Sequence, residues 1–145
     1  PQAQAVIAVD TGVFLALADR SDRWHQSAQG ALETLSEGWV TTWPVITEAC
    51  HLLRARLEAR AVFDLIDDVA DGSIALWSPT PAHVAKLPAL LRKYASLPMD
   101  LADASLVLLA EHLGHGRILS TDLRDFGAYR WKNRKPFRNL LELPR

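Results

Sequence analysis

Short apolar runs alternate along this chain with longer segments of helical periodicity. The runs that have the length and β-branched content of buried strands are residues 5–9, 39–42, 73–77 and 117–121. Every gap between them is long enough for the crossover that parallel neighbours in a sheet require. The alternation predicts one α/β domain over residues 1–145, with three α/β/α layers around a mainly parallel central sheet.

The gaps between these runs contain helical patterns. Six helices are expected. The first passes through residues 13–17, the second begins at Ser21, the third runs through 43–53 and the fourth through 59–69. The fifth runs from Thr80 to about Tyr94, and the last runs from just after Pro98 to Gly114 or Gly116. Thr80-Pro81 supplies an N-cap and a first-turn proline. Small residues in the last helix predict close packing against its neighbours.

Composition places the chain among ordinary globular proteins, with 49% hydrophobic and 23% charged residues. No apolar run approaches the ~20 residues of a membrane span, and no basic-then-apolar leader precedes the first strand. A single cysteine, Cys50, excludes an internal disulfide and a cysteine-based zinc cage. The cytoplasm is the default location, and no membrane association is expected.

Positive charge is concentrated at the end of the chain, although the net charge is only −1. Residues 117–145 contain eight basic residues against three acidic ones. This asymmetry favours an anionic partner for the basic segment, whereas a solvated surface is the ordinary alternative. The residues that we expect to contact nucleic acid are Arg124, Arg130, Lys132, Arg134 and Lys135.

Four carboxylates occupy positions where a parallel sheet builds its sites. Asp10 and Asp122 follow strands, whereas Glu48 and Asp103 lie in the early turns of helices. If they meet in one crevice, their repulsion raises their pKa values unless a cation is present. Oxygen ligands favour Mg²⁺ or Mn²⁺, which can activate water and orient a phosphodiester.

The same acidic residues also have structural interpretations. Asp10 can cap the next helix, and Asp100 and Asp103 can stabilise the start of another through capping and the helix dipole. Glu48 can be an exposed surface residue. Taken alone, the Asp100–Asp103 pair is better explained by capping than by catalysis.

Other kinds of site find little support. The five histidines have no zinc-ligand spacing, and no glycine-rich phosphate loop or dinucleotide fingerprint follows a strand. No Gly-x-Ser-x-Gly elbow is present, and Asp10-Thr11-Gly12 lacks the second aspartate of a phosphoaspartyl phosphatase.

An ordered set of four short motifs resembles the PIN-domain nucleases, and most of all the toxin ribonucleases of the VapC type. The motifs are Val9-Asp10-Thr11, Thr47-Glu48-Ala49, Leu97-Pro98-Met99-Asp100-Leu101-Ala102-Asp103-Ala104 and Ser120-Thr121-Asp122. The segment from 123 to 130 is also similar to the one that follows the last acidic residue in those toxins. The resemblance extends over nearly the whole chain, and its specificity comes from the order of the motifs.

The resemblance implies a site and an activity. Asp10, Glu48, Asp103 and Asp122 would form an acidic catalytic pocket, and all four are candidate ligands of Mg²⁺ or Mn²⁺. Asp100 is a further possible member. Thr11 and Thr121 would donate hydrogen bonds behind the ligands. The family further implies metal-dependent RNA cleavage, homodimerisation, and inhibition by a cognate antitoxin.

Three functions remain open from the sequence. The first is an endoribonuclease that acts as the toxin of a type II toxin–antitoxin pair. The second is a nuclease of the same fold that processes RNA or cuts DNA without an antitoxin. The third is a non-catalytic RNA-binding module, against which the intact set of four acids argues, because clustered negative charge repels phosphate.

Overall fold

The structure, a computed structural model, describes residues 5–145; residues 1–4, which the predicted domain includes, lie outside the described part. The strands are β1 (Val6–Val9), β2 (Gly38–Thr42), β3 (Ile74–Trp77), β4 (Arg117–Leu119), β5 (Arg130–Trp131), β6 (Lys135–Pro136) and β7 (Arg138–Asn139). The helices are α1 (Thr11–Ala18), α2 (His25–Thr34), α3 (Trp43–Arg56), α4 (Ala59–Ala70), α5 (Pro81–Val84), α6 (Leu87–Lys93), α7 (Leu101–Leu113) and α8 (Leu123–Ala128). All four predicted strands are present, although the fourth ends two residues early.

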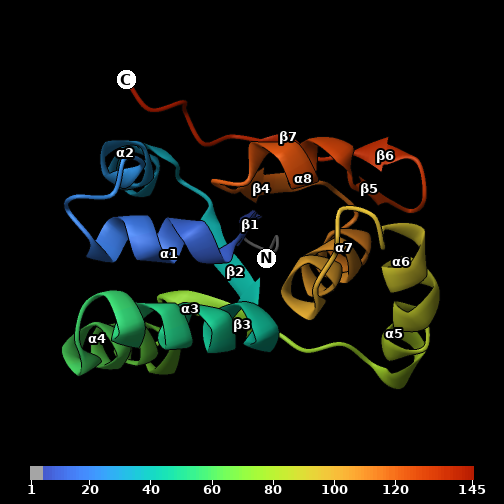
Figure 1. The fold of residues 1–145 in the computed structure, drawn as a ribbon, viewed down its shortest axis with the longest axis horizontal. Coiled ribbons are helices and arrows are strands. Elements are labelled where there is room, and N and C mark those ends of the chain that lie inside the picture. The colour runs from blue at the N-terminus through green and yellow to red at the C-terminus, as the bar shows by residue number, and fades with distance from the viewer. Residues whose placement is uncertain (1–4) are drawn as a thin grey trace.

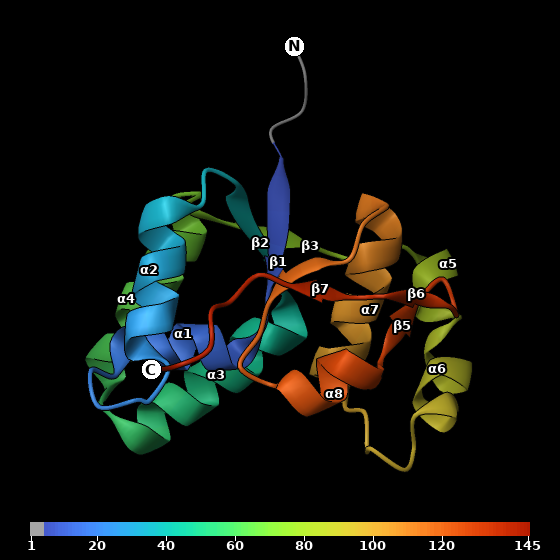
Figure 2. The same ribbon diagram turned by 90° about the horizontal axis from the view of Figure 1, so that it is seen from above.

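A parallel five-stranded sheet of order β3-β2-β1-β4-β7 forms the centre of the molecule. Figure 2 shows α1, α2 and α4 on one side of this sheet and α5, α6 and α7 on the other. The predicted three-layer α/β/α fold is therefore confirmed. Among residues 5–145, no helix has the length and apolar character that crossing a bilayer requires.

The two middle strands bring distant parts of the chain together. Val9 of β1 pairs with Leu119 of β4, and the Asp10 N–H donates to the Leu119 carbonyl over 3.0 Å. Both strands are buried because helices cover both faces, as their continuous apolar sequences predict. The residues that follow them, Asp10 and Ser120, consequently lie side by side at the carboxyl edge of the sheet.

Helix α7 packs on one face of this sheet (Figure 1). It contacts β1, β2 and α3, and its residues from Ala104 to Ala110 are all buried. Ala102, Ala104 and Ser105 let these elements approach closely, as predicted. The Ser105 hydroxyl also bonds the Thr42 hydroxyl at 2.6 Å, so the polar groups in this contact are satisfied.

The predicted continuous helix from Thr80 to about Tyr94 is wrong. It begins at the Thr80 N-cap as expected, but it divides into α5 and α6 around residues 85–86. Pro88 explains the division, because it has no N–H for the Val84 carbonyl and its ring would clash there. It is accommodated in the first turn of α6 instead.

Candidate active site

Asp10 lies at the end of β1, and it is only 7% exposed. One carboxylate oxygen accepts the Thr11 N–H at 2.7 Å and thereby caps α1. The other oxygen accepts the Ser120 hydroxyl at 2.9 Å. Capping and a place among the acids are therefore compatible roles for this residue, since a carboxylate oxygen that accepts one hydrogen bond keeps a second lone pair.

Ser120 connects the ends of β1 and β4. Its side chain is fully buried, and its hydroxyl oxygen accepts the Asp122 N–H at 3.0 Å while the hydroxyl donates to Asp10. The family resemblance implies a supporting role for the neighbouring Thr121, whereas the contact with Asp10 comes from Ser120. Successive side chains of a strand point to opposite faces, and this alternation is the sequence signal that could have identified Ser120 as an inward-facing residue.

The two predicted supporting threonines have different surroundings. The Thr121 hydroxyl fills the space beside Gly12, where an added Cβ would lie 1.9 Å from its oxygen. The Thr11 hydroxyl oxygen is buried and forms no hydrogen bond of ordinary length among the described residues, but the hydroxyl is close enough to Glu48 to lower the pKa of that carboxyl. The expected support of an acid by Thr11 is therefore directed at Glu48.

Asp103 and Asp100 form a reciprocal cap at the start of α7. The Asp103 N–H donates to Asp100 at 2.8 Å, and the Asp100 N–H donates to Asp103 at 3.3 Å. The Tyr129 hydroxyl donates to the same Asp103 oxygen at 3.0 Å. Tyr129 is fully buried and comes from the end of α8, so no local pattern in the sequence indicated this contact.

Glu48 and Asp122 complete the acidic edge. Glu48 projects from α3 and is half-buried. Asp122 caps α8 by accepting the Asp125 N–H at 3.0 Å. Both are close enough to Asp10 for their charges to raise its pKa. Asp10 is in turn close enough to Asp103 to raise the pKa of that residue. The structure therefore brings all four predicted acids to one place; Asp100 and the previously unassigned Asp125 border them.

The acids are held in a poorly solvated, mutually repelling group. Burial raises the pKa of Asp10 from 3.8 to about 6, against the hydrogen bonds from Ser120 and Thr11. Burial, and then the charges of Asp100 and Asp10, raise the pKa of Asp103 to about 7. The pKa of Glu48 is raised by burial and by Asp100. This is the repulsion that the sequence predicted for acids in one crevice without a cation.

The donor set fits a hard divalent cation. It consists of carboxylate oxygens beside the buried Thr11 hydroxyl, and the described hydrogen bonds to Asp10 and Asp103 come from hydroxyl and backbone N–H groups and not from histidine or cysteine. Within residues 5–145, no three acidic, histidine or cysteine side chains converge tightly enough to enclose an ion alone. Mg²⁺ suits such an open arrangement, because it keeps several waters and binds one or two carboxylates directly.

The basic residues near the site have different surroundings. The Arg130 guanidinium donates to the carbonyls of Gly127, Ala128 and Tyr129, so it closes the end of α8. The ammonium groups of Lys132 and Lys135 lie over the Trp131 ring, and Arg124 and Arg134 are exposed. Most of the predicted nucleic-acid contacts thus lie free at the surface, whereas Arg130 is engaged within the protein.

The chain is similar to known proteins over most of its length. The family model described as PIN domain matches residues 7–132. The chain is 25% identical over 122 residues to Ribonuclease VapC26 of Mycobacterium tuberculosis. The aligned region covers 84% of this chain and 90% of that protein. The chain also resembles the crystal structure of VapC20 from the same organism, described as a sarcin-ricin loop cleaving toxin. That likeness has a TM-score of 0.75 and 19% identity, and covers 81% of this chain and 91% of the other.

Proposed function

Since the chain belongs to the PIN-domain family, we propose that it is a divalent-metal-dependent endoribonuclease that acts as the toxin of a toxin–antitoxin pair. The observation that carries the proposal is the meeting of Asp10, Glu48 and Asp103 with raised pKa values at the carboxyl edge of the sheet. Such an arrangement is costly for folding, because buried like charges repel. A bound cation would relieve this repulsion and would also attract an anionic substrate, so the arrangement is better explained by function than by stability.

The residues of this chain divide the work between holding a cation and placing water. Asp10, Asp103 and Asp122 would hold Mg²⁺ or Mn²⁺, which supplies activation of water and neutralises charge on the phosphodiester when bound. Glu48 would orient the attacking water or accept its proton. Ser120 and Tyr129 fix the rotamers of Asp10 and Asp103, so these carboxylates need little reorganisation when the ion binds.

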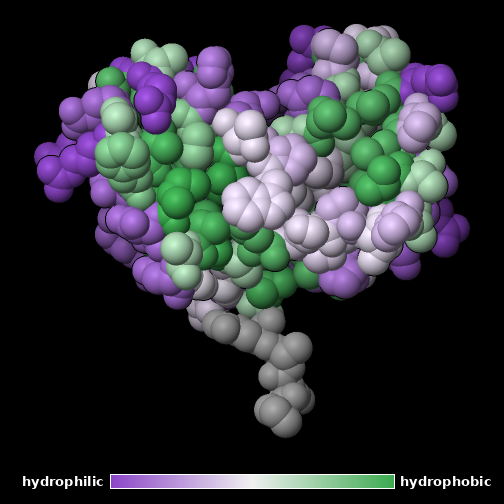
Figure 3. Space-filling view, turned by 90° about the horizontal axis from the view of Figure 1, so that it is seen from below, coloured by the Kyte–Doolittle hydropathy of each residue, from purple (hydrophilic) through white to green (hydrophobic). Residues whose placement is uncertain are grey.

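The partners in the proposal are RNA, a cognate antitoxin and a second copy of the chain. The relative VapC26 is named a ribonuclease, and VapC20 is described as a toxin. An apolar groove between α1, α2 and α4 leaves Leu32 51% and Leu57 39% exposed, which supports docking of an amphipathic antitoxin segment. Hydrophobic side chains also gather on the face beneath α3 and α4 (Figure 3), and this apolar surface supports the proposed homodimer. The cytoplasm, where RNA is made and used, is the proposed location.

Cleavage of a labelled pool of cellular RNAs tests the proposal. The pool is incubated with Mg²⁺, Mn²⁺ or EDTA and with wild type, Asp103→Asn or Asp67→Asn. Asp67 is the matched control, because it is an exposed acid on α4. We expect discrete products that require metal, persist with Asp67→Asn and disappear with Asp103→Asn. Metal-dependent RNA binding without any cleavage would favour the RNA-binding module instead.

Loss of tight Mn²⁺ binding in Asp103→Asn, with the fold intact, tests the ligand assignment separately. A Mn²⁺ affinity equal to that of wild type would show that Asp103 is not a ligand. An adjacent gene for a small DNA-binding protein that blocks cleavage would distinguish a toxin from an RNA-processing or DNA-cutting nuclease.

A further inference from the structure

A second cleft lies outside the acidic pocket, between α5, α6, α7 and the turn that joins β5 to β6. Its volume is about 620 Å³. Leu90 and the fully buried Leu108 give it an apolar floor, and the side chains of Lys86, Lys93 and Lys132 line it as well. A cleft with an apolar floor and a few charged groups suits a small group that is apolar on one side and charged on the other.

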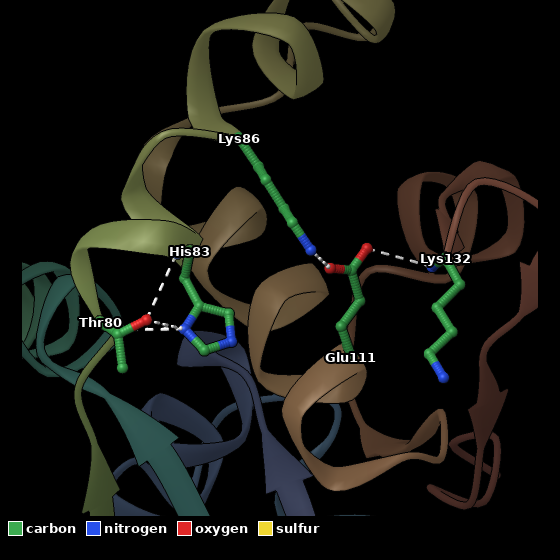
Figure 4. Close-up of polar contacts among 5 residues, drawn as sticks. All are labelled: Thr80, His83, Lys86, Glu111 and Lys132. Carbon is green, nitrogen blue, oxygen red and sulfur yellow. Dashed lines mark hydrogen bonds and ion pairs between the residues drawn. The ribbon is translucent and has the colours of Figure 1, made fainter.

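The cleft carries an excess of positive charge. Among the described residues, Glu111 is the only carboxylate that lines it, and both of its oxygens are engaged. One accepts the Lys86 ammonium at 3.3 Å, and the other accepts the backbone N–H of Lys132 at 3.2 Å (Figure 4). Across residues 5–145, neither the Lys93 nor the Lys132 ammonium forms a salt bridge with a carboxylate. The charges of these two ammonium groups are therefore not neutralised by a carboxylate, although Lys93 donates one hydrogen bond to the Asn133 carbonyl and Lys132 lies over the Trp131 ring.

The turn that carries Lys132 is held in an unusual conformation. Lys132 and Asn133 have φ values of 48° and 66°, in the left-handed region that side chains other than glycine and asparagine rarely adopt. Two contacts hold the turn against the helices: the Lys132 N–H donates to Glu111, and the Lys93 ammonium donates to the Asn133 carbonyl at 3.3 Å. The turn joins the antiparallel strands β5 and β6, and tight hairpin turns favour positive φ, so the contacts with Glu111 and Lys93 fix where Lys132 is held beside the cleft.

His83 adds a directed donor to the same cleft. Its Nδ1 accepts the Thr80 N–H at 3.2 Å and lies 2.7 Å from the Thr80 hydroxyl (Figure 4). Because Nδ1 is an acceptor in the first contact, the neutral ring carries its proton on Nε2. No described residue accepts a hydrogen bond from Nε2, so the ring can donate to a ligand oxygen.

The cleft is close to the acidic pocket. Glu111 follows Asp103 by eight residues on α7, a distance along the helix of about 12 Å. Lys93 lies over the ring of Tyr94, which packs against Tyr129, and Tyr129 bonds Asp103. A linear polymer bound at the acids could therefore reach the cleft with only a few of its own monomer units.

We propose that this cleft binds a nucleotide of single-stranded RNA that flanks the scissile phosphodiester. Lys93 and Lys132 contact its phosphates, His83 donates to a phosphate or sugar oxygen, and the ribose and base cover the floor formed by Leu90 and Leu108. Lys86, which is paired with Glu111, offsets the charge of that carboxylate. The inference rests on the proposed function, because the acidic pocket is what brings RNA to this end of α7. It assigns binding of the flanking nucleotide to residues outside the group of four acids, because phosphate and sugar contacts position the RNA without reading its sequence.

The test measures RNA affinity and its salt dependence in an Asp103→Asn background, so that the RNA stays intact. A labelled single-stranded RNA that wild type cleaves is titrated between 50 and 200 mM salt with Lys86→Gln/Lys93→Gln/Lys132→Asn. Asparagine is chosen at 132 because it tolerates positive φ. The control, Arg54→Gln/Arg56→Gln/Arg60→Gln, removes the same charge from exposed sites on α3 and α4. Lys93→Gln alone serves if the triple variant does not fold.

We expect the lysine variant to bind RNA roughly tenfold more weakly at low salt than the control variant, with a salt slope smaller by about 1.4 if two phosphate contacts are lost. Lys93→Gln alone should reduce the slope by about 0.7. Equal affinities and slopes in the lysine and control variants, with wild type cleaving the RNA, would overturn the inference and leave the nuclease proposal standing. An acidic peptide that loses binding in the lysine variant while RNA does not would assign the cleft to a protein partner. Failure of wild type to cleave any RNA is the separate outcome that contradicts the proposed function.

Discussion

Tyr129→Phe isolates one hydrogen bond in the acidic pocket. The Tyr129 ring packs edge-on against Tyr94 and Phe126, with centroids 5.1 Å apart in each pair, and phenylalanine preserves these contacts. Only the hydroxyl that donates to Asp103 at 3.0 Å is lost. A hydrogen bond to a charged group contributes about 1.5–3 kcal/mol, and the partial exposure of Asp103 favours the lower value. About 1.5 kcal/mol corresponds to roughly one pKa unit.

The expected effect on metal binding follows from this number. The pKa of Asp103 is about 7 in the metal-free protein, so about half of the molecules carry the carboxylate at pH 7. A pKa near 8 in the variant leaves about one tenth ionised, and the apparent Mn²⁺ affinity at pH 7 should fall about fivefold. At pH 9 both proteins are about fully ionised, and the difference should nearly disappear.

Calorimetric titration of Mn²⁺ at pH 7 and pH 9 makes the measurement. Tyr94→Phe is the matched control, because its hydroxyl accepts the Arg130 N–H and touches no acid in the described contacts. Equal Mn²⁺ affinities of wild type and Tyr129→Phe at pH 7 would refute the assignment of this hydrogen bond. A loss of the same size at pH 9 would show that the hydroxyl acts by positioning Asp103 and not through its ionisation.

Two further predictions concern stability. In EDTA, the free energy of unfolding should fall as pH rises from about 4 to 7, because folded Asp10 and Asp103 have pKa values above those of the unfolded chain and bind more protons in this window. Asp10 accounts for at most roughly 3 kcal/mol of this fall in the free energy of unfolding. Thermal melting at pH 5 and pH 8 should therefore show a smaller loss of stability with rising pH in Asp10→Asn than in wild type. An equal loss in the two proteins would contradict this. Gly12→Ala should destabilise the protein by about 1–3 kcal/mol and impair cleavage, since the new Cβ would lie 1.9 Å from the Thr121 hydroxyl oxygen. Gly30→Ala, which meets nothing within 4 Å in α2, should stabilise it by about 0.5–1 kcal/mol, and similar melting temperatures for the two variants would refute the packing argument.

Local patterns in the sequence predicted most of the fold and the four acids. Strands buried on both faces give continuous apolar runs, and the carboxyl ends of parallel strands share one edge, so Asp10 and Asp122 could be placed together before any coordinates were known. The Asp100–Asp103 pair was recognised as a cap and as a pocket component, and its geometry accommodates both roles.

The parts that escaped prediction depend on longer-range physics or on one residue's backbone. Pro88 divides a segment whose side-chain periodicity continues through it, so periodicity alone extended the helix too far. Ser120 and Tyr129 support acids that lie 110 and 26 positions away in the chain. Such contacts are set by strand register and side-chain packing, which no local pattern contains. The Lys132–Asn133 turn is similar, because its conformation depends on Glu111.

The sheet order also determines when the acidic pocket can exist. β1 comes from the start of the described chain, yet its partner β4 and the supporting Ser120 and Tyr129 come more than a hundred residues later. During synthesis, Asp10 cannot acquire its full set of neighbours until β4, Ser120 and Tyr129 have also been made, because non-local strand pairing forms late. A chain that ends before Tyr129 should therefore lack the completed acidic cluster. The ribonuclease that we propose would consequently be inactive toward RNA beside its own ribosome until residues beyond Tyr129 have emerged.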